Sequence, residues 1–313
     1  MTAAGGDRVA AAIDVGSNSV LLLTIAVSAG GRASAIDEAV ATTRLGAGLL
    51  AGGPLDPAAV RRTRDAVVAF TARARALGAT NVWAFATGAA RRAADGAAFA
   101  AETAAAAGVP VEILSGAREA ALAHAAIVHG LGLDTAPVLA IDTGGATTEL
   151  TLARGATVEA AVSLPLGALA LTETRGGDLA GMRADVAAVL ATTDVPARAR
   201  AAGATAIASG GTVTALVALA LGLRRYEPRH VHGTWLAVER LGALAAAGAG
   251  ADPGVLDPDR AVLLPAGACI VEGVSAAAGA RELRVSDHGV RHAYLRERLA
   301  AVGVPSSMEA LWD

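Results

Sequence analysis

The sequence predicts two similar α/β domains, and three observations support this. The stretches Ala12–Ala26 (AIDVGSNSVLLLTIA) and Ala140–Ala153 (AIDTGGATTELTLA) match almost residue for residue: each has a strand, an aspartate, a glycine-containing turn and a second strand. A weaker copy, Ala206–Leu216, keeps the strand and the glycine turn but lacks the aspartate. The length of 313 residues suits two domains that each bury a core. A repeat at this spacing indicates duplicated domains rather than a solenoid.

Composition restricts the function classes. Apolar residues make up 54% of the chain and aromatic residues only 3%, so Ala, Val and Leu must build the cores. The net charge of −3 provides no global positive field for nucleic acid, and any polyanion site must be local. Cys269, the one cysteine, excludes an intramolecular disulfide and a cysteine metal cluster and fits a reducing compartment. With no signal-like N-terminus and with charges or glycines breaking every long apolar run, we expect a cytoplasmic protein without a membrane span.

The chain begins with two predicted strands, Arg8–Val15 and Asn18–Val27, joined by a turn. Side-chain hydroxyls and amides in this turn can reach an anion, although in turns they commonly satisfy only the local backbone. The candidate anion-binding residues here are Gly16, Ser17, Asn18 and Ser19.

A glycine-rich loop, Gly46–Gly53, precedes a helix that begins after the N-cap Asp56 and runs to about Leu77. The strand Asn81–Thr87 then leads to Arg91. An arginine just past the carboxyl end of a strand lies where open α/β sheets bind ligands. The alternative for Arg91 is an ordinary surface arginine.

The next elements are a helix at Asp95–Ala107, a strand at Val109–Leu114 and, after Ser115-Gly116, a helix at Ala117–Leu131. Glu119 lies in the first turn of this last helix. An acidic residue there either complements the helix dipole or performs chemistry. The position alone leaves both open.

The stretch Val138–Leu150 predicts a β-hairpin. A buried run ends in Asp142, and Gly144 and Gly145 form a tight turn whose backbone N–H groups no side chain blocks. Such turns bind anions. An aspartate beside a bound phosphate requires a divalent cation between the two, so the sequence predicts a magnesium-type site at Asp142 and at the matching Asp14.

The rest of the chain alternates helices and strands and contains a third anion site at Ser209–Thr212, where a glycine turn opens a helix. We expect the densest basic cluster to guide a polyanion; it comprises Arg224, Arg225, Arg229, His230 and His232. The predicted elements are strands at Thr157–Ser163, Thr205–Ala208 and Glu282–Val285, helices at Leu164–Arg175, Asp178–Thr193, Trp235–Ala247 and Asp259–Ala278, a polar linker at Arg198–Gly203, and a last helix to about Val302.

Taken in order, these motifs resemble the exopolyphosphatase and guanosine pentaphosphate phosphohydrolase (Ppx/GppA) family in its short, two-domain form. Each motif is weak alone, but the ordered set is specific and covers essentially the whole chain. It consists of Ile13–Ser19, Ala86-Thr87 with Arg91, Leu114–Gly116 with Glu119, Ile141–Gly145 with Glu149, Ser163–Gly167, Ser209–Thr212, and Val285–Asp287 with Arg291. Two departures are Ala117–Ala121, which lacks the family's acidic pair, and Ala146, which stands where a third glycine is usual.

The resemblance implies an actin-like (ASKHA, ribonuclease H-like) fold of duplicated domains flanking a cleft, with domain I at 1–127 plus 289–313 and domain II at 128–288. It also implies a homodimer that hydrolyses inorganic polyphosphate with Mg²⁺. In that assignment Glu119 is the base that activates a water and Arg91 neutralises the phosphoryl oxygens. The phosphate-binding residues would be Gly16, Ser17, Asn18, Ser19, Gly144, Gly145, Thr147, Ser209 and Gly210, and the metal ligands Asp14, Asp142 and Glu149.

Three alternatives share these motifs. The first is removal of the 5′ γ-phosphate from guanosine pentaphosphate, which the motifs do not separate from polyphosphate hydrolysis. The second is a non-catalytic nucleotide or alarmone sensor on the same fold, which loss of Glu119 or Arg91 would have favoured. The third is a sugar or acetate kinase, which would not be expected to place a glutamate at position 119.

Overall fold

A computed structural model describes residues 6–49, 52–133, 135–252, 254–304, 307–308 and 311; positions 50 and 51 of the predicted glycine-rich loop lie outside them. The chain forms two compact units. Unit 1 comprises Met1–Ser115 and Val290–Asp313, and unit 2 comprises Gly116–Gly289. Among the described residues, every helix is too short or too polar to cross a membrane.

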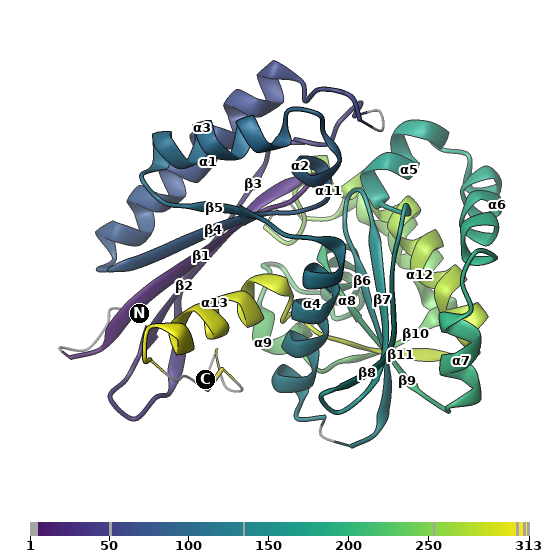
Figure 1. The fold of residues 1–313 in the computed structure, drawn as a ribbon. Coiled ribbons are helices and arrows are strands. Elements are labelled where there is room, and N and C mark those ends of the chain that lie inside the picture. Colours follow the sequence, from purple (N-terminus) through teal and green to yellow (C-terminus); the bar gives the residue numbers. More distant parts are fainter. Residues whose placement is uncertain are drawn as a thin grey trace. The chain divides into compact units, whose positions relative to one another are not determined.

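Unit 1 is built on a five-stranded mixed sheet with the strand order β3-β2-β1-β4-β5 (Figure 1). Strands β1, β2 and β3 form an antiparallel meander, and β4 and β5 continue parallel to β1. The strands are β1 (Arg8–Val15), β2 (Ser19–Val27), β3 (Ala33–Thr42), β4 (Asn81–Ala86) and β5 (Val111–Ile113), and the helices are α1 (Pro57–Ala76), α2 (Gly88–Arg92), α3 (Gly96–Ala107) and α13 (Val290–Ala301).

The two faces of this sheet are covered by different helices. Alternate residues of β1, among them Ile13 and Val15, join the core under α1 and α3. On the other face α13 packs along β1, and the tilted rings of Tyr294 and Phe85 are in contact with centroids 4.5 Å apart. Because side chains alternate along a strand, Asp14 lies on the α13 face.

Unit 2 repeats this plan around a six-stranded sheet with the order β10-β11-β9-β6-β7-β8. Its strands are β6 (Pro137–Thr143), β7 (Thr148–Arg154), β8 (Thr157–Leu164), β9 (Thr205–Ser209), β10 (Trp235–Ala237) and β11 (Glu282–Val285). Its helices are α4 (Gly116–Leu131), α5 (Ala168–Arg175), α6 (Leu179–Leu190), α7 (Val195–Ala201), α8 (Gly211–Ala220), α9 (Pro228–Val231), α10 (Leu241–Ala247), α11 (Pro258–Ala261) and α12 (Leu264–Ala278), with 3₁₀ turns at Val238–Arg240 and Gly248–Gly250.

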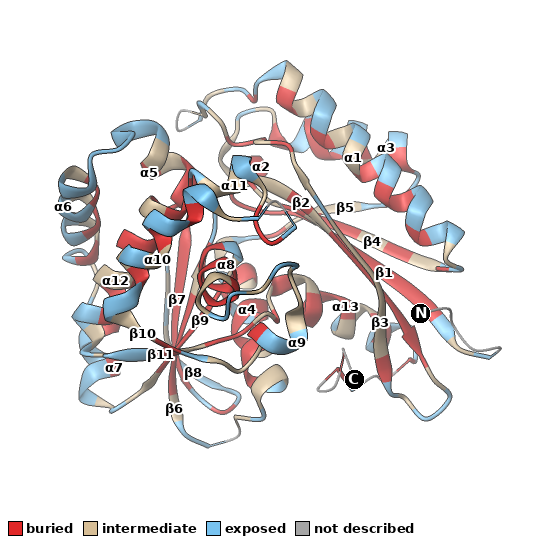
Figure 2. Ribbon diagram, turned by 180° about the vertical axis from the view of Figure 1, so that it is seen from behind, coloured by how far each residue is buried: buried red, intermediate tan, exposed pale blue. Residues whose placement is uncertain are grey.

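The same alternation positions the site in unit 2. Leu139 and Ile141 face the large core with α12, whereas Val138 and Ala140 form a smaller core with Ile127 of α4. Figure 2 agrees with this layering, because the inner strands of the sheet are largely red for buried, whereas a covering helix such as α12 has both buried and exposed residues. Asp142, two residues beyond Ala140, therefore faces α4.

The two sheets have the same topology. In each, an antiparallel three-stranded meander (β1-β2-β3 or β6-β7-β8) is followed by parallel strands beside its first strand (β4-β5 or β9-β11). Unit 2 adds β10 at the edge. This order confirms the predicted duplicated α/β fold of the actin-like, ribonuclease H-like class.

The chain passes from unit 1 to unit 2 at Ser115/Gly116 and returns at Gly289/Val290. The first crossing precedes α4, whereas the boundary expected from the sequence was 127/128, near the end of that helix. The whole helix joins unit 2 because it packs on β6, β7, β8 and β9.

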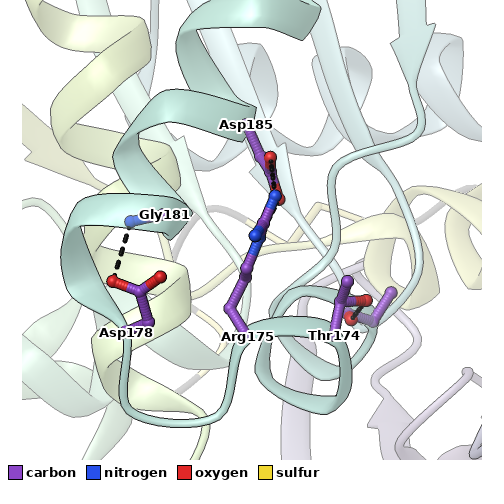
Figure 3. Close-up of polar contacts among 6 residues, drawn as sticks. Thr174, Arg175, Asp178, Gly181 and Asp185 are labelled. Carbon is purple, nitrogen blue, oxygen red and sulfur yellow. Dashed lines mark hydrogen bonds and ion pairs between the residues drawn. The ribbon is translucent and has the colours of Figure 1, made fainter.

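Helices α5 and α6 are joined by a polar turn (Figure 3). Asp178 caps α6 by accepting a hydrogen bond from Gly181 N at 3.0 Å. Arg175 at the end of α5 pairs with Asp185 of α6 through two hydrogen bonds of 2.6 and 2.7 Å. These contacts fix the short helix α5, whose other end contacts the glycine turn of the hairpin.

Three predicted elements differ from the structure in type or continuity. The predicted linker Arg198–Gly203 is largely helical as part of α7, because the preceding Pro196 opens a helix and Ala199 is buried. The predicted helix Trp235–Ala247 begins as strand β10, which pairs with β11. The predicted helix Asp259–Ala278 is broken into α11 and α12 because Pro265 cannot donate the backbone hydrogen bond that a helix interior requires.

Candidate active site

The predicted hairpin is present, and its turn is closed by a backbone hydrogen bond. Strands β6 and β7 pair antiparallel with Asp142 opposite Glu149, and Gly144 N donates to Thr147 O at 2.9 Å to close the turn. The first turn of the chain is closed in the same way, because Gly16 N donates to Ser19 O at 3.0 Å. The repeat seen in the sequence is therefore a repeat of geometry.

The turn carbonyls of the hairpin are held by the start of α5. Gly144 O accepts from Ala168 N at 2.9 Å, and Gly145 O accepts from Leu169 N and Ala170 N at 3.0 and 3.1 Å. In a trans peptide unit the C=O group and the following N–H group point in opposite directions. The N–H groups of Gly145 and Ala146 therefore point away from α5, as an anion-binding nest requires.

Gly167, which precedes α5, makes this packing possible. A Cβ atom at this position would overlap the backbone of Gly145 and Ala146. Ala146 itself, the departure from the usual third glycine, is buried at 4% exposure. Thr148 adds a further tie, since its Oγ1 donates to Leu166 O at 2.7 Å.

Three carboxyl groups gather beside this turn in unit 2. Asp142 and Glu149 face each other across β6 and β7 on the side of the sheet that α4 covers, and Glu119 lies in the first turn of α4. Glu119 and Glu149 are buried, with exposures of 7% and 2%. Ser209 Oγ donates to Asp142 at 2.8 Å, and Ser163 Oγ donates to Glu149 at 2.6 Å.

Burial and crowding raise the pKa values of Glu149 and Asp142. Burial, followed by the charges of Glu119 and Asp142, raises the pKa of Glu149 to about 8 against the opposing hydrogen bonds from Ser163 and Thr147. Burial also raises the pKa of Asp142, although the Ser209 hydroxyl counteracts it. A buried cluster of like charges of this kind is typical of a functional site, because it is unfavourable unless protons or a cation balance it.

The third predicted anion site lies at the end of β9. Gly210 has a φ of 100°, and a Cβ atom there would lie 2.6 Å from Thr143 O, so the tight turn into α8 requires glycine. This turn brings Ser209 and the N-terminus of α8 next to Asp142. The guanidinium of Arg260 lies over Gly211, with its Nη2 3.4 Å from Gly211 O. No sequence pattern points to Arg260, because the contact links residues far apart in the chain.

The other predicted residues belong to unit 1. Asp14 is half-buried near the end of β1, and the turn of Gly16–Ser19 follows it, with Asn18 Nδ2 donating to Ser19 Oγ at 3.1 Å. Arg91 lies in α2, and its Nη1 donates to Leu114 O at 3.0 Å, in the segment that leads into α4. The predicted residues Glu119, Asp142, Glu149, Gly144, Gly145, Thr147, Ser209 and Gly210 thus belong to unit 2, and Asp14, Gly16, Ser17, Asn18, Ser19 and Arg91 belong to unit 1.

One or two carboxylates of this site could take part in binding a divalent cation. In the described part of the chain, no three histidine, cysteine, aspartate or glutamate side chains are arranged to hold a metal ion by themselves. Mg²⁺ commonly binds through one or two carboxylates and takes its remaining ligands from water and substrate phosphates. Asp142 and Glu149, opposed on neighbouring strands with raised pKa values, suit that mode of binding.

The predicted basic cluster is less positive than its sequence indicates. Arg229 and His230 both pair with Glu227, at 3.0 and 3.2 Å. The His232 ring is held by Gly130 O at 2.8 Å and accepts from Asp287 N at 3.2 Å, and burial is the main cause that lowers its pKa. His232 is therefore a neutral structural residue, which corrects its place in the predicted cluster. The exposed cations of the cluster are Arg224, Arg225 and Arg229, and the charge of Arg229 is offset by Glu227.

Comparison with known proteins identifies related sequences. A model of the Ppx/GppA phosphatase family matches residues 24–301. Exopolyphosphatase 2 of Mycobacterium tuberculosis (strain ATCC 25618 / H37Rv) is 36% identical over 171 residues, which are 52% of this chain and 53% of that protein. A guanosine-5'-triphosphate,3'-diphosphate pyrophosphatase of Vibrio parahaemolyticus is 31% identical over 173 residues, 55% of this chain and 34% of that protein. The chain thus matches about half the length of the first relative and a third of the second.

Solved structures show the same fold. The Ppx/GppA family member of Aquifex aeolicus superposes with a TM-score of 0.73 at 25% identity and covers 95% of this chain and 99% of its own. An exopolyphosphatase from Cytophaga hutchinsonii, at 19% identity and a TM-score of 0.82 over 96% of this chain and 100% of its own, shares the fold. The family match spans most of the sequence, and the chain belongs to the Ppx/GppA phosphatase family.

Proposed function

We propose that this protein is an exopolyphosphatase, which releases orthophosphate from the end of inorganic polyphosphate. The observation that carries the proposal is the cluster of Glu119, Asp142 and Glu149 beside a glycine turn whose N–H groups point away from the packed side of the loop. Anion-binding amides next to crowded carboxylates suit a phosphate ester or anhydride bound with a cation. The name of the Mycobacterium tuberculosis relative agrees with this substrate.

The proposed reaction is the attack of water on the terminal phosphorus. The bond from the water oxygen to phosphorus forms, the bond from phosphorus to the bridging oxygen breaks, and that oxygen becomes the new end of the shortened chain. Glu119 takes the proton that the water loses. The amides of Gly145 and Ala146 and the guanidinium of Arg91 hold the phosphoryl oxygens, whose charge must be balanced in the transition state.

Asp142 and Glu149 would hold a divalent cation, Mg²⁺ in our proposal, together with the phosphates. A bound cation supplies neutralisation of the phosphate charge in such reactions. Ser209 and Ser163 orient the two carboxyl groups through their hydroxyls. Asp14 of unit 1, which follows the same strand-and-turn pattern, is proposed as a further cation ligand, directly or through water.

The second candidate, removal of the 5′ γ-phosphate of guanosine pentaphosphate, is favoured by the Vibrio relative named above. Orthophosphate release from medium and long polyphosphate, measured beside guanosine pentaphosphate with Mg²⁺ or excess chelator, separates the two. We expect release from polyphosphate that requires the cation. Release from the nucleotide alone would support the second candidate, and binding without release from either would support a sensor.

A further inference from the structure

Arg44 has an unusual backbone in unit 1. Among the described residues other than glycine, it alone has a positive φ, at 52°. This left-handed conformation is unfavourable for a residue with a Cβ atom and is readily adopted by glycine. Its neighbours Thr43 and Leu45 are buried at 3% and 1% exposure, so the surrounding packing holds the conformation in place.

The loop that contains Arg44 is built onto the first anion-binding turn. Thr43 N and Arg44 N both donate to Asn18 O, at 3.0 and 2.8 Å, and Gly46 N donates to Ser17 O at 2.8 Å. By the peptide geometry that applies to the hairpin turn, the N–H groups of Asn18 and Ser19 then point away from this loop. The loop 43–46 therefore holds the carbonyl groups of the first turn, as the start of α5 holds those of the hairpin turn.

Two further contacts tighten this arrangement. A Cβ atom on Gly46 would lie 3.0 Å from Ser17 Cβ and 3.3 Å from Ser17 O, so the loop rests directly on the turn. The guanidinium of Arg62 on α1 donates to Thr43 O at 3.1 and 3.3 Å. The positive φ at Arg44 is thus a consequence of how closely the loop follows the turn.

The geometry would accept glycine at position 44 without strain, yet the chain carries arginine. The Nε atom of Arg44 is buried although the residue as a whole is half-exposed, so the side chain lies against the protein rather than extending into solvent. A strained residue at a functional site is commonly retained for its side chain. Its backbone is hydrogen-bonded to Asn18, and a guanidinium is long enough to reach an anion at that turn.

We propose that Arg44 is a further phosphate-binding residue, held beside the Ser17–Ser19 turn by the strained loop 43–46. This rests on the proposed phosphohydrolase function. A planar guanidinium next to outward N–H groups would bind a phosphate of the substrate with charge-assisted hydrogen bonds, which are stronger than those between neutral groups. The unfavourable backbone conformation of Arg44 would then be retained because it places the guanidinium beside the turn.

The test is the substitution Arg44→Gly, which relieves the backbone and removes the whole side chain with its guanidinium. Arg44→Lys keeps the charge, and Arg61→Ala on α1 is a control that removes an exposed arginine. We expect Arg44→Gly to unfold at the same temperature as wild type or higher, while kcat/KM for long polyphosphate falls at least about tenfold, mainly through KM. Arg44→Lys should retain part of the activity.

Two results would overturn the assignment. One is a kcat/KM of Arg44→Gly equal to that of wild type. The other is a loss of activity together with a lower unfolding temperature, which would give the arginine a packing role instead. Wild-type protein that releases no phosphate from polyphosphate would contradict the proposed function rather than this assignment, so the two failures are distinguished within one experiment.

Discussion

Replacing Glu149 by glutamine is expected to stabilise unit 2 at neutral pH. Burial and the charges of Glu119 and Asp142 raise the pKa of Glu149 to about 8, whereas an exposed glutamate titrates near ~4.3. As the pH rises between these values, the unfolded chain releases its proton while the folded protein retains it. The free energy of unfolding is therefore unaffected well below pH ~4 and falls progressively up to pH ~8.

The magnitude follows from this interval. At pH 7 the unfolded glutamate is about 2.7 pH units above its pKa of ~4.3, whereas the folded one is still mostly protonated. At ~1.4 kcal/mol per unit this difference is a penalty of about 4 kcal/mol. Glutamine keeps an oxygen that can accept the hydrogen bond from Ser163, so the substitution removes the charge without leaving that hydroxyl unpaired. For a domain of this size, ~4 kcal/mol corresponds to a rise in Tm of roughly 8 to 16 °C.

The assay is thermal unfolding of metal-free protein from pH 5 to 9. The Tm of wild type should fall relative to that of Glu149→Gln as the pH approaches 8, and the two should nearly converge at pH 5. The control is Glu239→Gln, which removes an exposed glutamate and should follow wild type at every pH. Parallel curves for wild type and Glu149→Gln would refute the reasoning that Glu149 is a crowded, buried acid.

Three further predictions concern binding and packing. Asp142→Asn should raise the Mg²⁺ concentration needed for half-maximal phosphate release at least about tenfold, and full release in excess chelator would contradict a cation role. Gly167→Ala should lower the stability of unit 2 by ~1 to 3 kcal/mol in chemical unfolding, whereas Gly177→Ala, with open space around it, should not; equal effects would contradict the packing argument. Replacing Arg224 and Arg225 by serine should raise KM for long polyphosphate and flatten its salt dependence while sparing short chains. An unchanged salt dependence would contradict a role of this basic cluster in guiding the polyanion.

The sequence predicted those parts of the site that depend on local pattern. An apolar strand, an aspartate and a glycine turn are a local pattern, and this pattern is enough to predict a hairpin such as Val138–Leu150. The N-cap at Asp56 is equally local, and the structure has its carboxylate accepting from Ala59 N at 2.8 Å. Because the pattern occurs twice, the duplicated topology could be predicted as well.

What the sequence could not predict depends on contacts between distant residues. The loop 43–46 and the start of α5 hold the two turns through backbone groups, and backbone hydrogen bonds leave no residue signature. His232 looked like part of a positive cluster because its burial and its bond to Gly130 are tertiary features. The sequence predicts a helix from Trp235 because the three residues of strand β10 are too few to show the alternation of apolar and polar residues that marks a strand.

The most direct test of the proposed reaction is the steady-state rate of Glu119→Gln on polyphosphate in the presence of Mg²⁺. Glutamine keeps the size and polarity of the side chain but cannot take a proton from water. We expect kcat to fall at least ~10²-fold while the affinity for polyphosphate and the Tm stay close to wild type, and Glu102→Gln, an exposed residue of α3, should have no effect. Near wild-type turnover by Glu119→Gln would contradict the proposal that Glu119 is the general base and would mean that it only complements the dipole of α4.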